Sequence, residues 1–303
     1  MRFAFVKCHG SGNDFPLIDA RSLSLGDAEW AVVARALADR AGTAGGDGLL
    51  LLTAGDGEHD FGMRMFNSDG SEAETCLNGL RCVARAGFEA LGLETARVRL
   101  KTSSADVARV ADLAPGVTTI RTRVGPASTD LADVGLTGPL SDLPSARSFV
   151  AVAMPNPHLV TFVDRVDEAE LVALGEWCEA APPLIPGRAN VSFVEQRGPD
   201  LYVRTFERGV GLTNSCGSAM ASSVYAAGLT DRVPFGAATT VFNKGGLVRG
   251  TASAEGIVTI EGNATFLYDA QVEIADGIAG PVEDRIDRDG EADAWANAVA
   301  ALA

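Results

Sequence analysis

Two of the five cysteines, Cys76 and Cys216, occupy equivalent places in the chain and could act as acids and bases. Each lies ten positions after the phenylalanine of an Arg-x-Phe tripeptide, Phe66 in one case and Phe206 in the other. The residues between are turn formers, and an apolar helical pattern follows each cysteine. A cysteine at the first turn of a helix lies among unpaired backbone N–H groups, which lower the thiol pKa and favour the thiolate.

A thiolate and a thiol on opposite sides of one carbon atom could invert its configuration. One sulfur would remove the α-proton of an amino acid, and the other would return a proton to the opposite face. The developing negative charge needs preorganised donors, and the backbone amides of two helix starts are suitable. Four residues after the cysteines are therefore expected to bind the substrate carboxylate: Asn78, Gly79, Gly217 and Ser218.

The other three cysteines are expected to have structural roles. Cys82 and Cys178 lie within apolar helical patterns, and Cys8 lies on an expected N-terminal strand, which indicates packing. An odd number of cysteines without regular spacing is not typical of a disulfide framework. The chain has no Cys-x-x-Cys and its three histidines lie far apart, so we predict no metal site.

The pattern of strands and helices that must position these cysteines occurs twice in the chain. Asn13 lies 53 positions before Phe66, and Asn156 lies 50 positions before Phe206. After each asparagine come a short strand pattern, a helical pattern and an apolar strand, in the same order. The expected helices cover 27–40 and 167–180, and the expected apolar strands cover 49–53 and 191–195. Three matching spacings in one order indicate duplication of a whole domain.

We therefore predict an α+β fold of two pseudo-symmetric domains with an active-site cleft between them. Each domain is expected to be a strand-rich sheet wrapped around a central helix that begins at the cysteine. The halves cover about 1–124 and 125–262, and the strand 264–274 is expected to return to the first half. Residues 275–303 are expected to form an acidic tail, in which 291–302 could form a helix.

The bulk composition excludes several classes of function. The 303 residues are 47% hydrophobic and 21% charged, as is typical of a globular protein. The formal net charge of −15 argues against a nucleic-acid partner. No apolar run is long enough to cross a bilayer, which argues against a membrane partner. The N-terminal residues lack the apolar core and cleavage site of a signal peptide, so we expect a cytoplasmic protein.

Five motifs resemble those of the diaminopimelate epimerase family, in that family's order and spacing. They are KCHGSGNDF (7–15), NSDGSEAETCLNG (67–79), MPNPH (154–158), RANVSFVE (188–195) and ERGVGLTNSCGS (207–218). The resemblance covers about residues 1–275. It implies two pseudo-symmetric domains, catalysis without pyridoxal phosphate, other cofactor or metal, and interconversion of LL- and meso-diaminopimelate on the lysine and peptidoglycan route.

The resemblance also implies roles for individual residues. Cys76 and Cys216 would be the acid/base pair, with His158 poising Cys76 and Glu207 poising Cys216. Several polar side chains would bind the substrate, chiefly its distal amino-acid end: Asn13, Asn67, Asn156, Asn190, Glu207 and Arg208. One arginine with several amides suits a zwitterionic amino-acid group.

Two alternatives stay open at the level of sequence. Leu77 and Leu212 stand near the cysteines where the family usually has Gly and Glu, and Gly48 stands where some members have Gln. These departures favour a related racemase or epimerase of another amino acid. The second alternative is a non-catalytic amino-acid-binding protein that keeps the cleft. The expected partner is a small amino-acid substrate, and the sequence leaves a homodimer open.

Overall fold

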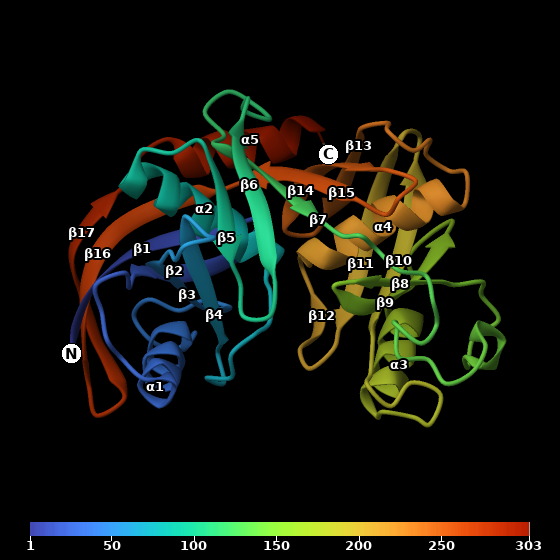
Figure 1. Cartoon of the computed structure of the whole chain (residues 1–303), viewed down its shortest axis with the longest axis horizontal. Coiled ribbons are helices and arrows are strands. Elements are labelled where there is room, and N and C mark those ends of the chain that lie inside the picture. Colours follow the sequence, from blue (N-terminus) through green and yellow to red (C-terminus); the bar gives the residue numbers. More distant parts are fainter. Residues whose placement is uncertain (303) are drawn as a thin grey trace. The chain divides into compact units, whose positions relative to one another are not determined.

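The computed structural model describes residues 1–302 and divides the chain into two compact units (Figure 1). The first unit comprises Met1–Thr122 together with the chain from Glu261 onward, and the second unit comprises Arg123–Ile260. The chain leaves the first unit within β7 (Thr119–Val124) and returns to it within β15 (Val258–Asn263). The second unit is therefore one continuous segment, whereas the first is assembled from both ends of the chain.

The first unit contains one continuous ladder of paired strands. Its strands are β1 (Arg2–Gly10), β2 (Asn13–Asp19), β3 (Gly48–Ala54), β4 (Phe61–Asn67), β5 (Thr95–Arg99), β6 (Ser104–Val110), β16 (Thr265–Ala275) and β17 (Ile278–Asp287). The order across the ladder is β17, β16, β1, β2, β3, β4, β5, β6. The β2–β3 and β4–β5 pairs are parallel, and the remaining pairs are antiparallel.

The second unit repeats this ladder. Its strands are β8 (Val150–Met154), β9 (Asn156–Val163), β10 (Asn190–Arg197), β11 (Asp200–Glu207), β12 (Gly211–Thr213), β13 (Thr239–Asn243) and β14 (Gly246–Ala252). The order β8, β9, β10, β11, β13, β14 matches β1 to β6, and β9–β10 and β11–β13 are again the parallel pairs. The short strand β12 adds an antiparallel pairing to β11.

The helices occupy equivalent places in the two units. Helices α1 (Asp27–Ala38) and α3 (Glu168–Glu179) follow the second strand of each ladder, and a 3-10 turn, η1 (Leu140–Asp142), precedes β8. Helices α2 (Leu77–Leu91) and α4 (Gly217–Leu229) follow the fourth strand. The predicted duplication is confirmed by this common order of elements. No helix within residues 1–302 is long and apolar enough to span a membrane.

The second helix of each unit lies at its centre. Helix α2 packs against every strand from β1 to β6, and α4 packs against the six equivalent strands, β8 to β11, β13 and β14. Every residue of α4 from Gly217 to Gly228 is buried. A helix that is covered on all sides cannot be amphipathic, which explains its run of Ala, Ser and Gly. The predicted α+β fold, a sheet wrapped around a central helix in each half, is confirmed.

The C-terminal segment completes the first unit. Strand β16 pairs with β1 along its whole length, from Arg2 opposite Glu273 to His9 opposite Thr265. Residues 275–303, set apart by sequence as an acidic tail, contain β17 and helix α5 (Glu291–Leu302). The side chain of Trp295 on α5 is buried, with its ring 6.1 Å from the ring of His9.

Candidate functional site

Cys76 stands at the N-cap of α2, where sequence placed it. Its backbone is extended, with φ −148° and ψ 102°, and its sulfur accepts a hydrogen bond from the backbone N–H of Gly79 at 3.4 Å. The side chain is half-buried. Because the first N–H groups of a helix have no partner within the helix, this position stabilises negative charge on the sulfur.

The residues that follow Cys76 are fixed by packing. Gly79 lies directly against β3, because an added Cβ would come within 2.6 Å of the Leu50 side chain. Leu77 is only 3% exposed, so its side chain belongs to the interior of the unit. The departure at Leu77 therefore adds no large exposed side chain at the start of α2. Leu212, on β12, is instead 37% exposed.

A chain of hydrogen bonds orients the asparagines beside Cys76. The Cys76 thiol donates to Oδ1 of Asn13 at 3.8 Å, and Nδ2 of Asn78 donates to the same oxygen at 3.4 Å. On its other side, Nδ2 of Asn13 donates to Oδ2 of Asp47, and Nη2 of Arg40 donates to Oδ1 of Asp47. The Asn13 amide is thus held with its oxygen toward Cys76. Sequence reasoning missed Asp47 and Arg40, which have no counterpart in the repeat.

Cys216 stands at the N-cap of α4, in the place equivalent to Cys76. It is only 8% exposed, and its sulfur lies 3.5 Å from Oγ of Ser218. Burial raises the pKa of the Cys216 thiol well above its usual value, and the nearby Glu207 carboxylate raises that pKa further. The Ser218 hydroxyl and the Ala219 N–H oppose this only in part. Cys216 is therefore protonated at neutral pH.

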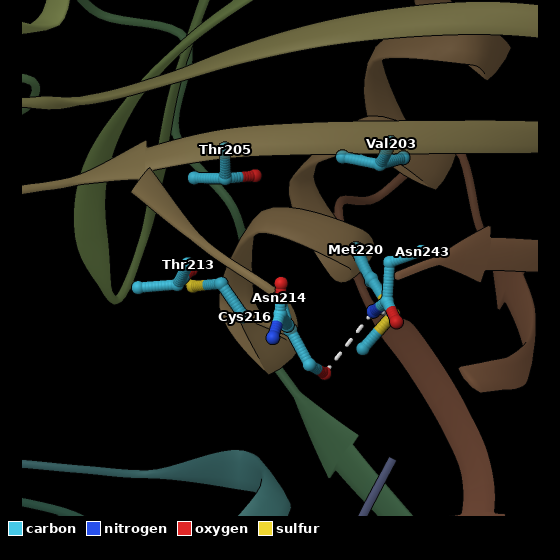
Figure 2. A pocket seen from close by; sticks show the side chains of 8 residues that line it. Val203, Thr205, Thr213, Asn214, Cys216, Met220 and Asn243 are labelled. Atoms are coloured by element: carbon cyan, nitrogen blue, oxygen red, sulfur yellow. Dashed lines mark hydrogen bonds between the residues drawn. The ribbon is translucent and has the colours of Figure 1, made fainter. Parts of the chain in front are cut away.

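A narrow hollow in the second unit borders Cys216 between β11, β13 and the start of α4 (Figure 2). Its lining is polar on one side, where Nδ2 of Asn243 donates to Oγ of Ser215 at 3.0 Å. The other lining residues are Val203, Thr205, Thr213, Asn214 and Met220. The hollow is too narrow to hold a water molecule.

His158 is fully buried near the start of α4. Its Nε2 lies 3.1 Å from Oγ of Ser218 and accepts from Nδ2 of Asn190 at 3.4 Å. Within residues 1–302, its Nδ1 has no hydrogen-bond partner. Burial lowers the pKa of His158 to about 3, and the charge of Arg208 lowers it as well, so the ring is neutral. Oδ1 of Asn190 in turn accepts from the backbone N–H of Arg208 at 2.8 Å.

The strand registers show which expected binding residues are equivalent. Asn13 and Asn156 begin β2 and β9, and Asn67 and Glu207 end β4 and β11. Gly48 pairs with Asn67 at the start of β3, and Asn190 begins β10, the equivalent strand. The repeat thus presents the same backbone positions twice with different side chains.

The structure brings only some of the expected residues together. In the first unit, Asn13, Asn78 and Gly79 contact Cys76 or one another. Asn67 instead donates from Nδ2 to Oγ of Ser71 at 3.0 Å, within its own turn. Asn156 pairs with Met154 in the β8–β9 hairpin.

The second unit gathers more of them around one helix start. Ser218 contacts Cys216 and His158, and Asn190 contacts His158 and Arg208. Glu207 acts on the Cys216 thiol, and Gly217 is the first residue of α4.

Solved structures place the fold in a known class. A hydroxyproline epimerase from Agrobacterium vitis superposes with a TM-score of 0.60 at 14% identity, covering 99% of this chain and 97% of that one. A phenazine biosynthesis protein of the PhzF family from Bacillus anthracis superposes with a TM-score of 0.64 at 16% identity, covering 90% and 100%. At this identity the likeness concerns the fold alone. The fold is therefore the two-unit α+β architecture that these proteins share.

Sequence comparison identifies the family within this class. The family model described as diaminopimelate epimerase matches residues 5–123 and 150–267. A diaminopimelate epimerase of Clostridium acetobutylicum is 37% identical over 284 residues, which cover 89% of this chain and 85% of the relative. One of Listeria innocua is 36% identical over 293 residues, covering 90% and 89%. The chain belongs to the diaminopimelate epimerase family, as its motifs predicted.

Proposed function

We propose that this protein is a diaminopimelate epimerase that interconverts LL- and meso-diaminopimelate by proton transfer between Cys76 and Cys216, without pyridoxal phosphate or a metal. One observation carries the proposal. The two cysteines cap equivalent central helices of a duplicated fold, in a chain 36–37% identical to proteins named diaminopimelate epimerase. The proposal requires that both helix starts reach the same α-carbon.

In this proposal the two sulfurs begin the reaction in different protonation states. The Cys76 sulfur, which accepts the Gly79 N–H, starts as the thiolate and removes the α-proton. Cys216, whose thiol pKa is raised, starts protonated and delivers its proton to the opposite face. The reverse reaction exchanges these roles. The products are one inverted α-carbon and a pair of sulfurs with the proton on Cys76.

The helix starts would also hold the reacting carboxylate. The backbone N–H groups at the two helix starts would be preorganised donors that stabilise the charge developing on the carboxylate as the α-proton leaves. Asn78, Gly79, Gly217 and Ser218 form this part of the site in the proposal. The neutral ring of His158 would poise Cys76 through Nδ1, the ring nitrogen that has no partner within residues 1–302.

The distal end of the substrate would be bound by side chains that do not take part in proton transfer. The proposed set is Asn13, Asn67, Asn156, Asn190, Glu207 and Arg208. Arg208 can bind the distal carboxylate, and the amide oxygens and Glu207 can accept from the distal ammonium group. A symmetric diamino diacid needs this second recognition point, because its two ends are chemically alike.

The test is proton exchange at the α-carbon. Purified reduced protein incubated with LL-diaminopimelate in deuterated water is expected to form the meso isomer and to incorporate α-deuterium. Cys76→Ala and Cys216→Ala should abolish both, whereas Cys178→Ala, a buried cysteine of α3, should preserve both. Absence of exchange in folded, reduced wild-type protein would refute the proposal.

The alternative substrate is another amino acid acted on by the same two thiols. The exposed Leu212 near the second cysteine favours it, because an apolar side chain replaces the carboxylate usual in the family. Deuterium exchange measured across free amino acids distinguishes the two, since a better substrate than diaminopimelate would replace the first assignment. A binding protein without turnover would bind ligand equally well after both cysteines are changed.

The proposal also includes a homodimer that acts in the cytoplasm. Light scattering coupled to size-exclusion chromatography measures the first, and cell fractionation measures the second. A monomer that retains full α-proton exchange would remove the dimer from the proposal without affecting the chemistry.

A further inference from the structure

Arg81 on α2 is a completely buried cation that has no carboxylate partner among the described residues. Its guanidinium donates to neutral oxygen atoms: Oδ1 of Asn78 at 2.9 Å, Oγ of Ser11 at 3.0 Å, the carbonyl of Asn263 at 3.1 Å and the carbonyl of Leu77 at 3.4 Å. Within residues 1–302, no Asp or Glu forms an ion pair with it. A buried charge normally has a counter-charge, because removing it from water is costly. The exception calls for a specific reason.

Arg85, one turn further along α2, shows what the usual arrangement looks like. It is also buried, but its guanidinium bonds to the carboxylates of Glu291 and Glu89 and stacks on the ring of Phe266. Both arginines connect α2 to neighbouring elements, so a purely structural role does not require the missing carboxylate. The lack of a carboxylate partner at Arg81 is therefore explained by what lies near its guanidinium, not by the bonds that connect α2 to its neighbours.

Those surroundings are the start of α2, five residues before Arg81. Nη2 of Arg81 holds Oδ1 of Asn78, and this bond turns the Asn78 nitrogen outward, where it donates to Oδ1 of Asn13 at 3.4 Å. The same oxygen of Asn13 accepts from the Cys76 thiol at 3.8 Å. Strand β1 packs closely against these side chains, since a Cβ on Gly10 would come within 3.0 Å of Nη2 of Arg81. The Asn78 amide is therefore held by hydrogen bonds at both its oxygen and its nitrogen.

The charge of Arg81 interacts with the sulfur of Cys76. Burial lowers the pKa of Arg81 to about 10, and negative charge on the Cys76 sulfur opposes that effect, so the guanidinium is charged at neutral pH. Electrostatic attraction is mutual, so a thiolate at Cys76 is stabilised by the same charge.

The other ionisable groups near α2 do not cancel this charge. On β1, burial raises the pKa of Cys8 and lowers that of His9 to about 4, so both are neutral at pH 7. Lys7 on β1 and Asp14 on β2 form an ion pair with each other. Within residues 1–302, no charged group of β3 to β6 contributes to the pKa of Arg81.

We propose that Arg81 is a positioning residue for proton transfer: it fixes the amide of Asn78 at the start of α2 and supplies the positive charge that favours the thiolate of Cys76. The proposal rests on the proposed role of Cys76 as the base. The equivalent position in the second unit is Ala221, five residues after Cys216, so α4 carries no charge at this position.

The charge is tested by the pH dependence of Cys76 alkylation. Iodoacetamide labelling of Cys76 is followed by peptide mass spectrometry over a range of pH, which needs no substrate. In Arg81→Gln, which is neutral but keeps amide donors, the midpoint of labelling is expected to rise by about one pH unit, or about tenfold in thiolate at a given pH. Arg81→Lys should restore most of the difference. The matched control Arg85→Gln should lower the melting temperature and leave the midpoint unchanged.

An unchanged midpoint in folded Arg81→Gln protein would overturn the charge role. If that variant does not fold, Arg81→Lys is the deciding variant, because a retained charge should keep the labelling midpoint within about half a pH unit. A larger rise in the midpoint would overturn the charge role of Arg81. Asn78→Leu tests the positioning role, with an expected rise of about tenfold in KM at an unchanged labelling midpoint; an unchanged KM would overturn it.

The outcomes are separable from those of the proposed function. Wild-type protein that exchanges α-protons while Arg81→Gln labels like wild type refutes only the role of Arg81. Wild-type protein that exchanges no α-proton while the labelling midpoint shifts refutes the proposed reaction and leaves the electrostatic effect on Cys76 in place.

Discussion

The two helix starts have the same geometry and opposite electrostatics. Cys76 and Cys216 are both N-caps with extended backbone, at equivalent points of a repeated ladder. Beneath Cys76 lies the buried cation of Arg81, whereas Cys216 lies near the carboxylate of Glu207 and the neutral ring of His158. A cation favours thiolate and a carboxylate favours thiol, which supports the proposed roles of Cys76 as the base and Cys216 as the acid.

This difference shows how a duplicated fold can acquire directional chemistry. The backbone supplies two helix starts by repetition, but the side chains at equivalent positions have diverged. Asn67 corresponds to Glu207, and Arg81 corresponds to Ala221. Two thiols in identical surroundings would have the same pKa. The proposed proton transfer needs one thiol and one thiolate, and the different side chains near the two cysteines favour that state.

The sharpest test of the comparison is removal of each sulfur. Cys76→Ala and Cys216→Ala are each expected to reduce kcat by about a thousandfold or more, because each removes a proposed acid or base. The measurement is LL- to meso-diaminopimelate conversion by chiral chromatography. Retention of more than a tenth of the activity in either variant would show that the two sulfurs are not a required pair.

The acidic partner of Cys216 offers the next largest effect. Glu207→Gln removes a negative charge near the thiol, so the Cys216 pKa should fall and its alkylation should become faster at pH 8. Turnover should fall by about tenfold to a hundredfold, because Cys216 would lose its proton more readily. Glu179→Gln, an ion-pair residue with Arg188 at the end of α3, is the control. Unchanged Cys216 labelling in Glu207→Gln would show that the Glu207 carboxylate does not raise the pKa of the Cys216 thiol.

The two buried histidines make stability depend on pH in both units. The folded pKa values are about 3 for His158 and about 4 for His9, both below the usual 6.5. The unfolded chain therefore binds more protons between these values and pH 6.5, so stability decreases as pH falls below 6.5. At pH 5 the loss is about 2 kcal/mol for each histidine. Urea unfolding at pH 7 and pH 5 measures this loss of stability. In His158→Gln, the part of the loss that comes from His158 should be absent.

The smallest expected effect comes from the ion pair that attaches α2 to α5, which should affect stability but not turnover. Glu291→Gln weakens the ion pair with Arg85, whose Nη2 donates to Oε1 of Glu291 at 2.8 Å. We expect a loss of about 1–2 kcal/mol in the free energy of unfolding. The value of kcat should stay within about twofold of wild type, because this pair does not face Cys76. A large loss of kcat with little loss of stability would show that α5 acts on the catalytic end of α2.

The sequence predicted the repeated order of elements because spacing between turn formers and apolar runs is a local property. The positions of Asn13, Phe66 and Cys76 relative to Asn156, Phe206 and Cys216 were enough to place both central helices. The helix expected over 27–40 ends at Ala38, which leaves Arg40 outside it to bond Asp14 and Asp47.

The burial of Arg81 and the orientation of Asn13 could not be predicted in the same way. An arginine in a helix usually faces solvent. Arg81 is buried because β1 covers it and the carbonyl of Asn263, 182 residues later in the chain, accepts its Nε. Asp47 acts on Asn13 from 34 residues away. Such contacts depend on the register of distant strands, and no local pattern records them.

The first unit is built from both ends of the chain, and this determines which of the two units can fold first during synthesis. During synthesis from the N-terminus, strand β1 is made first, but its neighbour β16 is made only after the whole second unit has been synthesised. The uninterrupted segment Arg123–Ile260 already contains all of its own ladder when it leaves the ribosome. The second unit can therefore fold first, while one edge of β1 and the face of α2 near Asn263 stay uncovered until the end of translation.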